Sequence, residues 1–410
     1  MALSHSSSCT LSLPVELWRF IIQEATYTHT YLNQWESDWP PSYDRTLQSY
    51  QTALRTKTAL TLVSRHFRDI TAEFLYEIVH LRSIHHAQLF LDLHYTDDVC
   101  AWTKYLLVKQ EKWESASVLT HAVAQILRQC RNLRGFGCIH YTDGRPVYSV
   151  GQGSRAEETL IKAIPPGVQF LDWDQATGGK FFSRLAPECT TSLRGLRLWS
   201  SDLLPPDVQH ESLASNTTFP YLTHLHLNRL GSEIVHWKLP SLIHFSLNFD
   251  DSRRLHEFLG IHSSSLISLS LGRFAGLNEN LLKQVLLTQY NLRELAYCLY
   301  FDGPEPTPLW ACTEGHNSLA HLHITCIHWP TFPLAYADLK HRLRCHVRPL
   351  DKVRFPKLQT VTITGVGWAF TERRFVRCMA AEETTGSLCE TAENLSVSLS
   401  QNGLRVFVLE

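Results

Sequence analysis

The stretch Leu222–Leu227 reads LTHLHL, and the stretch Leu242–Leu247 reads LIHFSL. Both carry an apolar residue at the first, fourth and sixth positions. Related phrases recur after residue 130, and they begin at Leu133, Val168, Leu193, Leu222, Leu242, Leu266, Leu292, Leu319, Leu358 and Leu404. A phrase that recurs every roughly 20 to 50 residues indicates a solenoid, because one unit cannot bury its apolar side until a neighbour stacks on it.

Each phrase is short, rich in β-forming residues, and followed by a loop and a helical stretch, as in Glu279–Gln289. In a strand, the first, fourth and sixth positions would face the interior, and the third, fifth and seventh would lie on an open face. Repeated strand–helix units predict an α/β fold, with a parallel sheet inside an arc and helices outside. Tyr105–Val108 and Glu77–Leu81 are candidates for still earlier strands, and Leu404–Leu409 is expected to close the sheet.

This pattern resembles the leucine-rich-repeat family in its irregular form. The Asn or Cys that the family carries after the third apolar position is mostly missing, and the unit lengths vary. The resemblance implies a surface that binds other proteins, without catalysis by this chain.

The front of the chain differs from the repeats. Residues 42 to 134 contain neither Gly nor Pro, which indicates a mainly helical section. Before it, residues 13 to 25 read LPVELWRFIIQEA, and a helix that begins here would place Leu13, Leu17 and Ile21 on one face. Pro14 suits the first turn of such a helix.

The L-P-x-E-L at Leu13–Leu17, together with the V-S-R-x-F at Val63–Phe67, resembles the F-box. This small helical module docks onto the Skp-type adaptor of cullin–RING ubiquitin ligases. The resemblance implies an adaptor-binding surface formed by Leu13, Pro14, Leu17, Ile21, Val63 and Phe67.

The two motifs are further apart than is usual in that family. We expect an F-box-like helical module over residues 1–82, with an inserted loop near 27–56, and the repeat solenoid over 83–410. The inserted loop could shield the adaptor surface or bulge from it. Alternatively, the front section is a helical cap that covers the first repeat.

Composition narrows the class of function. The chain has 410 residues, and its 38 Lys and Arg nearly balance its 39 Asp and Glu, so no net field attracts nucleic acid or an anionic membrane. Eleven cysteines occur singly, and the start lacks the pattern of a secretory signal. Reduced thiols in the cytoplasm, the nucleus or both are the expectation.

The sequence has no phosphate-binding loop, nucleophile elbow or H-E-x-x-H motif, so we predict neither an enzyme nor a cofactor. Histidines nevertheless gather at open-face positions of the repeats. Converging histidines permit a metal site or, as the commoner arrangement, a polar contact surface. We predict partner contacts, and no metal, at Arg197, Trp199, His224, His226, His244, His321 and His323. Contact through histidine would make binding respond between about pH 6 and 7.5.

Together these patterns favour a substrate-recognition subunit of an SCF-type ubiquitin ligase. It would bind a Skp-type adaptor through the helical module and an unidentified protein through the arc. The alternative is a leucine-rich-repeat scaffold or regulatory protein that joins no ligase.

Overall fold

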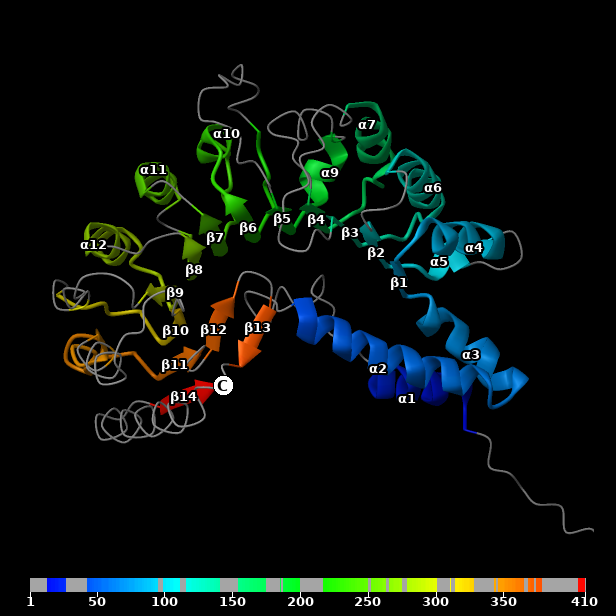
Figure 1. Cartoon of the computed structure of the whole chain (residues 1–410), viewed down its shortest axis with the longest axis horizontal. Coiled ribbons are helices and arrows are strands. Elements are labelled where there is room, and N and C mark those ends of the chain that lie inside the picture. Colours follow the sequence, from blue (N-terminus) through cyan, green and yellow to red (C-terminus); the bar gives the residue numbers. More distant parts are fainter. Residues whose placement is uncertain are drawn as a thin grey trace, which may run out of the picture.

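The computed structural model describes residues 13–26, 43–94, 99–110, 116–140, 154–174, 185, 187–199, 217–249, 252–262, 265–274, 279–300, 310, 314–327, 343, 346–364, 368–371, 374–377 and 405–409. Twelve strands among them form one sheet in the order β1 to β11 followed by β14, and every neighbouring pair is parallel. The sheet follows an arc, with the strands on its inner side (Figure 1). The predicted fold class, a parallel α/β solenoid that resembles leucine-rich repeats, is confirmed.

Each of the recurring phrases forms a strand. The strands are β3 (Gly135–His140), β4 (Phe170–Asp174), β5 (Gly195–Trp199), β6 (His224–Arg229), β7 (His244–Phe249), β8 (Ser268–Phe274), β9 (Glu294–Tyr300), β10 (His321–Ile327), β11 (Thr360–Thr364) and β14 (Arg405–Leu409). The two earlier candidates form β1 (Ile78–Leu81) and β2 (Tyr105–Gln110). Since β1 belongs to the sheet, the solenoid begins a few residues before the expected boundary at 82.

Helices cover the outer side of the arc (Figure 1). They are α4 (Ile84–His94), α5 (Val99–Trp102), α6 (Ala116–Gln129), α7 (Ser154–Ala163), α9 (Pro187–Ser192), α10 (Ser232–Val235), α11 (Ser252–Ile261) and α12 (Glu279–Thr288). Between helices and sheet lies one continuous apolar core, to which the first, fourth and sixth phrase positions contribute, such as Leu222, Leu225 and Leu227. Burying each such side chain stabilises the fold by about 2 kcal/mol, so stacking of repeats is the main stabilising term.

Backbone hydrogen bonds at the start of each strand also join successive repeats. The carbonyl oxygen of Arg134 accepts hydrogen bonds from the backbone N–H of Gln169, at 2.7 Å, and of Phe170, at 3.0 Å. The same double acceptance recurs at Glu77, Lys104, Gln169, Arg194, Thr223, Ile243, Ile267, Arg293 and Ala320. These strand-start carbonyls form a ladder of backbone bonds that runs from β1 to β11.

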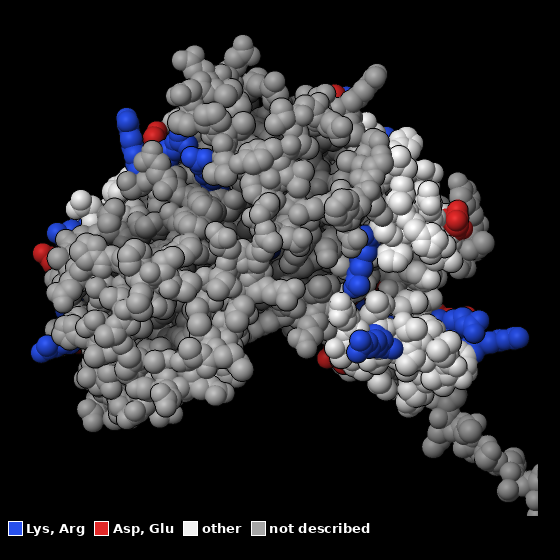
Figure 2. All heavy atoms as spheres, in the orientation of Figure 1, with Lys and Arg blue, Asp and Glu red and all other residues white. Residues whose placement is uncertain are grey.

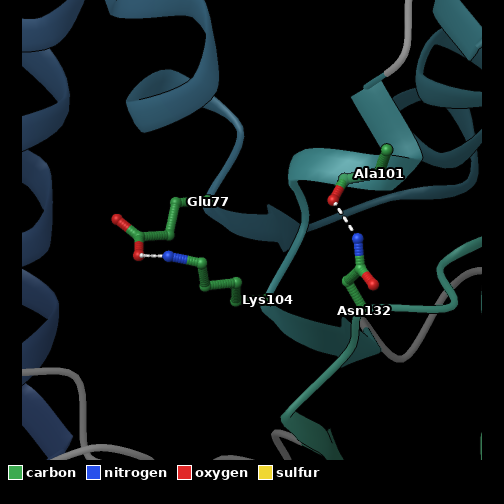
Figure 3. Close-up of polar contacts among 4 residues, drawn as sticks. All are labelled: Glu77, Ala101, Lys104 and Asn132. Carbon is green, nitrogen blue, oxygen red and sulfur yellow. Dashed lines mark hydrogen bonds and ion pairs between the residues drawn. The ribbon is translucent and has the colours of Figure 1, made fainter.

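Some side chains reinforce that ladder. Ser192 and Ser241 each precede a phrase, and their hydroxyls donate to the carbonyls of Val168 and Pro220, at 2.7 Å and 2.6 Å. Asn132, at the corresponding place, donates its amide to the Ala101 carbonyl at 2.8 Å (Figure 3). Each bond spans two successive repeats, so it fixes one turn of the solenoid on the previous turn.

In the described part of the front section, three helices precede the sheet: α1 (Val15–Thr26), α2 (Tyr43–Thr61) and α3 (Arg65–Leu75). The Ser64 hydroxyl begins α3 by accepting from the N–H of Phe67 at 3.1 Å. The inserted loop was expected near 27–56, but residues 43 to 56 are helical, so this expectation is wrong for its second half. The first half lies outside the described residues.

Helix α2 packs against the inner side of the sheet where the arc begins. Tyr50 contacts Ile78 and Leu107 in a separate small core, and Leu54 and Phe170 pack against it. The Tyr50 hydroxyl also donates to the Ile78 carbonyl at 3.3 Å. The helical module, α1 to α3, is therefore attached to the solenoid through α2.

At the far end, β12 (Trp368–Thr371) and β13 (Arg374–Arg377) form an antiparallel hairpin, which the sequence pattern did not predict. β12 lies against β10. Among the described residues, no helix has the length and apolar character needed to cross a bilayer. In Figure 2 the Lys and Arg side chains of the described residues, and fewer Asp and Glu side chains, appear mainly towards the edges of the visible face.

Candidate functional site

Helix α1 has two apolar sides. Ile22 and Thr26 are buried and face the other helices of the module. Leu17 and Ile21 of α1 are 48% and 44% exposed, and Leu13, just before the helix, is 40% exposed. A small helical module does not leave such a row in water without a reason, because burying it would be favourable. These residues are the predicted adaptor-binding positions on and directly before α1.

The sequence pattern did not identify Phe20, which is 60% exposed and lies one helical turn from Leu17. We call Leu13, Leu17, Phe20 and Ile21 the apolar stripe. The signal was available, because Phe20 continues the spacing of three and four residues. Pro14, at the start of α1, is exposed as well.

The residues of the second motif, Val63–Phe67, differ in exposure. Val63 is 63% exposed, and its neighbour Leu62, which we had not predicted, is 77% exposed. Phe67 is half-buried, because its ring meets that of Trp18 edge-on with centroids 4.9 Å apart. Phe67 therefore fixes α3 on α1 and contributes only part of its surface to a partner.

The inner face of the solenoid carries the other predicted residues. Strand register aligns two rows across it. The first row is Ile78, Tyr105, Gly135, Phe170, Gly195, His224, His244, Ser268, Glu294, His321 and Thr360, and the second is His80, Leu107, Gly137, Asp172, Arg197, His226, Ser246, Ser270, Ala296, His323 and Thr362. The structure thus brings the predicted histidines and Arg197 onto one face of one sheet.

An ion pair lies in the second row. The Arg197 Nη1 atom is 3.8 Å from Asp172 Oδ2, and both side chains are buried. The sequence pattern had not identified Asp172. His226 is the next residue in the row and is buried too. Burial, with a smaller contribution from the Arg197 charge, lowers the pKa of His226 well below its ordinary value, so this imidazole is neutral.

The histidines of the first row form a stack. The rings of His224 and His244 lie 4.3 Å apart at an angle of 12°. The Thr223 hydroxyl bonds to Nδ1 of His224 at 2.8 Å. Burial lowers the pKa of His244, although the Glu294 carboxylate opposes it, and burial also lowers the pKa of His323.

Histidine titration was expected to change binding between about pH 6 and 7.5. Burial lowers the pKa of His226, His244 and His323, because their protonated forms lose hydration in the fold, so a response from these three residues is expected at lower pH. The burial of Arg197, His224 and His226 also differs from the expected open surface, whereas His321 is exposed and bonds through Nδ1 to the Thr360 hydroxyl at 2.7 Å.

Two predictions stay open. The backbone of Trp199 ends β5, but its side chain lies outside the described residues. In the part of the chain that the structure describes, no group of three or more His, Cys, Asp or Glu side chains is arranged to hold a metal ion. The inner face therefore offers polar and stacked side chains, and the module offers apolar ones.

Comparison with solved structures finds chains of similar fold. The chain is similar to a chain of the crystal structure of the Rad7 and Elc1 complex in yeast, with 14% sequence identity and a TM-score of 0.34. The match covers 81% of this chain and 93% of that one. No protein-family model matches the sequence, and no curated protein matches it.

Proposed function

We propose that this chain is a substrate-recognition subunit of an SCF-type ubiquitin ligase. The helical module binds a Skp-type adaptor, and the solenoid holds a second protein. The chain itself carries out no chemistry; it raises the local concentration of its partner near the ligase.

The observation that carries this proposal is the apolar stripe. Its four side chains are exposed, whereas Ile22 and Thr26 of α1 are buried, and the stripe includes residues of the motif that resembles the F-box. A helix presenting apolar residues at three- and four-residue spacing suits a hydrophobic groove on a partner. A helical cap for the solenoid would need only one apolar side, and α1 has two.

Binding of purified full-length chain to a Skp-type adaptor tests the proposal. Leu13→Ala together with Leu17→Ala removes half of the stripe and leaves Ile22 and Thr26 in place. Since central apolar contacts each contribute about 1 to 2 kcal/mol, we expect affinity to fall roughly 100-fold.

A matched control is available on α4, where Leu89 and Leu93 are 46% and 38% exposed. Leu89→Ala together with Leu93→Ala removes the same atoms from another exposed helix and should bind the adaptor like the wild type. Equal affinity of wild type and stripe variant would refute the role of the stripe. Failure of the wild-type chain to bind any such adaptor would favour the alternative, a scaffold outside the ligase.

A further inference from the structure

Three successive repeats meet at His316, just before β10. Its side chain is 6% exposed, and its Nε2 atom bonds to the carbonyl of Gln289, between α12 and β9, at 3.1 Å. Its Nδ1 atom accepts from the backbone N–H groups of Ser318 and Leu319, at 3.3 Å and 3.0 Å. Its backbone N–H donates to the carbonyl of Arg354, before β11, at 2.9 Å. One residue thus connects the repeats of β9, β10 and β11, which follow one another along the arc (Figure 1).

These contacts fix the protonation state of the His316 ring. A backbone N–H can only donate, so Nδ1 must present its lone pair, and a carbonyl can only accept, so Nε2 carries the proton. A second proton, on Nδ1, would point at the N–H of Leu319. The backbone cannot easily shift to relieve that conflict, because Gly315, with a φ of +111°, packs so closely on Arg354 that a Cβ atom there would clash with the Arg354 carbonyl.

A second buried histidine lies in the same section of the core. Trp310 Nε1 donates to the hydroxyl of Tyr297, in β9, at 3.0 Å, and this hydroxyl also bonds to Nε2 of His346. All three side chains are at most 2% exposed. Burial raises the pKa of Tyr297, so its hydroxyl keeps its proton and donates it to the His346 ring. The rings of Trp310 and Phe355 meet edge-on with centroids 5.4 Å apart, so this cluster also reaches the segment before β11.

Both rings are therefore neutral hydrogen-bond acceptors in an apolar core. Burial lowers the pKa of both histidines, to about 4 for His346, and at His316 the bond to the Gln289 carbonyl opposes the shift. Ionisable side chains on the surrounding elements include Lys283 on α12, Tyr297 on β9, Glu314 before β10, Cys326 on β10, and Asp351 and Arg354 before β11. None of these charges contributes to the shift at either histidine, so a protonated ring would have no compensating partner.

We propose that His316 and His346 form an acid-sensitive joint that connects the β9 repeat to the repeats of β10 and β11. In an opened joint, both histidines take up protons as the pH falls through about 6.5. The closed joint takes them up only at lower pH, about 4 for His346. Acid therefore favours the opened joint, by up to about tenfold per histidine for each pH unit. This device goes beyond the proposed function and does not depend on adaptor binding.

Hydrogen exchange of the full chain as a function of pH tests the joint. Between pH 6.5 and 4.5, after correction for intrinsic exchange rates, protection of the β9 to β11 amides should fall at least about tenfold relative to β1 and β2. Unchanged relative protection overturns the proposal, and this result needs no variant.

Replacements that do not titrate identify the residues responsible. In His316→Asn the amide oxygen can still accept from the Leu319 N–H, and in His346→Gln it can still accept from the Tyr297 hydroxyl. Each variant should lose part of the pH dependence, and the double variant should change less than about threefold over the same range. His121→Asn, which replaces an exposed histidine on α6, is the control and should follow the wild type.

The slope with pH separates an acid-sensitive joint from a merely structural role. Histidines that only fill space would, when replaced, lower protection by the same factor at every pH and leave the pH dependence of the wild type in place. That outcome overturns the proposal. If the double variant does not fold, the two single variants decide by the same criterion.

Discussion

The inner face of the sheet is mainly apolar at one end and polar over the rest, although its residues occupy equivalent positions. Under α2, the two rows contain Ile78, Tyr105, Leu107 and Phe170, with the ring of His80 beside that of Tyr50. Beyond α2 the same rows continue with charged, imidazole and hydroxyl side chains, such as Arg197 and Ser246. The inner face is mainly apolar where α2 covers it. In the rest, which we call the polar part, side chains such as Arg197 and Ser246 are buried as well, so polar composition there does not by itself mark an open surface.

Breaking the ion pair of the polar part should have the largest effect. Asp172→Ala leaves the buried Arg197 guanidinium without its carboxylate, which we expect to lower the free energy of unfolding by about 4 kcal/mol. Urea denaturation measures this. The double variant Asp172→Leu with Arg197→Met should recover most of the loss, since it replaces both charges with apolar atoms. A double variant as unstable as the single one would show that the pair is not the cause.

Truncating the cover of the apolar part should have the next largest effect. Tyr50→Ala removes a buried ring from Ile78 and Leu107, and we expect a loss of about 3 kcal/mol in unfolding free energy. Tyr50→Phe keeps the ring and removes only the hydrogen bond to Ile78, so it should cost about 1 kcal/mol. Similar losses in the two variants would contradict the view that apolar packing holds α2.

Acid should loosen the polar part before the apolar one. In the unfolded chain His226 takes up a proton as the pH falls through about 6.5, whereas in the fold its pKa is far lower. The unfolded state therefore binds more protons below pH 6.5. Stability falls as the pH falls, by up to about 1.4 kcal/mol per pH unit for this residue.

Hydrogen exchange between pH 6.5 and 4.5, corrected for intrinsic rates, checks this expectation. Protection of β6 and β7 should decrease relative to β1 and β2, and His226→Asn should reduce the difference. Uniform loss of protection along the sheet would count against it.

The smallest expected effect concerns the stacked rings of His224 and His244. A cycle of His224→Ala, His244→Ala and the double variant should give a coupling energy of about 0.5 kcal/mol, the lower range for aromatic pairs. Exposed His85 and His86, whose ring centroids are 6.4 Å apart, provide the comparison cycle and should show less coupling. No coupling energy at either pair would show that the stacked rings of His224 and His244 do not stabilise the fold through their mutual contact.

The sequence predicted the solenoid because its apolar phrases report directly on burial. An apolar residue at the first, fourth and sixth positions is required in every repeat, whatever surrounds it. Leu242, Phe245 and Leu247 are completely buried, as this pattern implies. The strands β3 to β11 and β14 therefore follow from the phrases alone.

The cover of the inner face did not follow from local pattern. Helix α2 is polar overall. Its apolar residues Tyr50 and Leu54 are too few to predict a buried helix from the sequence, and their packing is evident only from the sheet beneath them. For the same reason, His224 and Arg197 were expected to be open. Whether an open-face residue is buried depends on segments distant in sequence, and periodicity contains no information about them.

The strand-start carbonyls explain how this solenoid tolerates irregular repeats. Each acceptor is a backbone atom, and each donor is a backbone N–H at the beginning of the next strand. Nothing in this connection depends on side-chain identity or on the length of chain between two strands. Insertions of different size can thus accumulate between strands while the sheet keeps its register. A lineage carrying this fold is free to change the lengths of its loops repeatedly at little cost to the architecture.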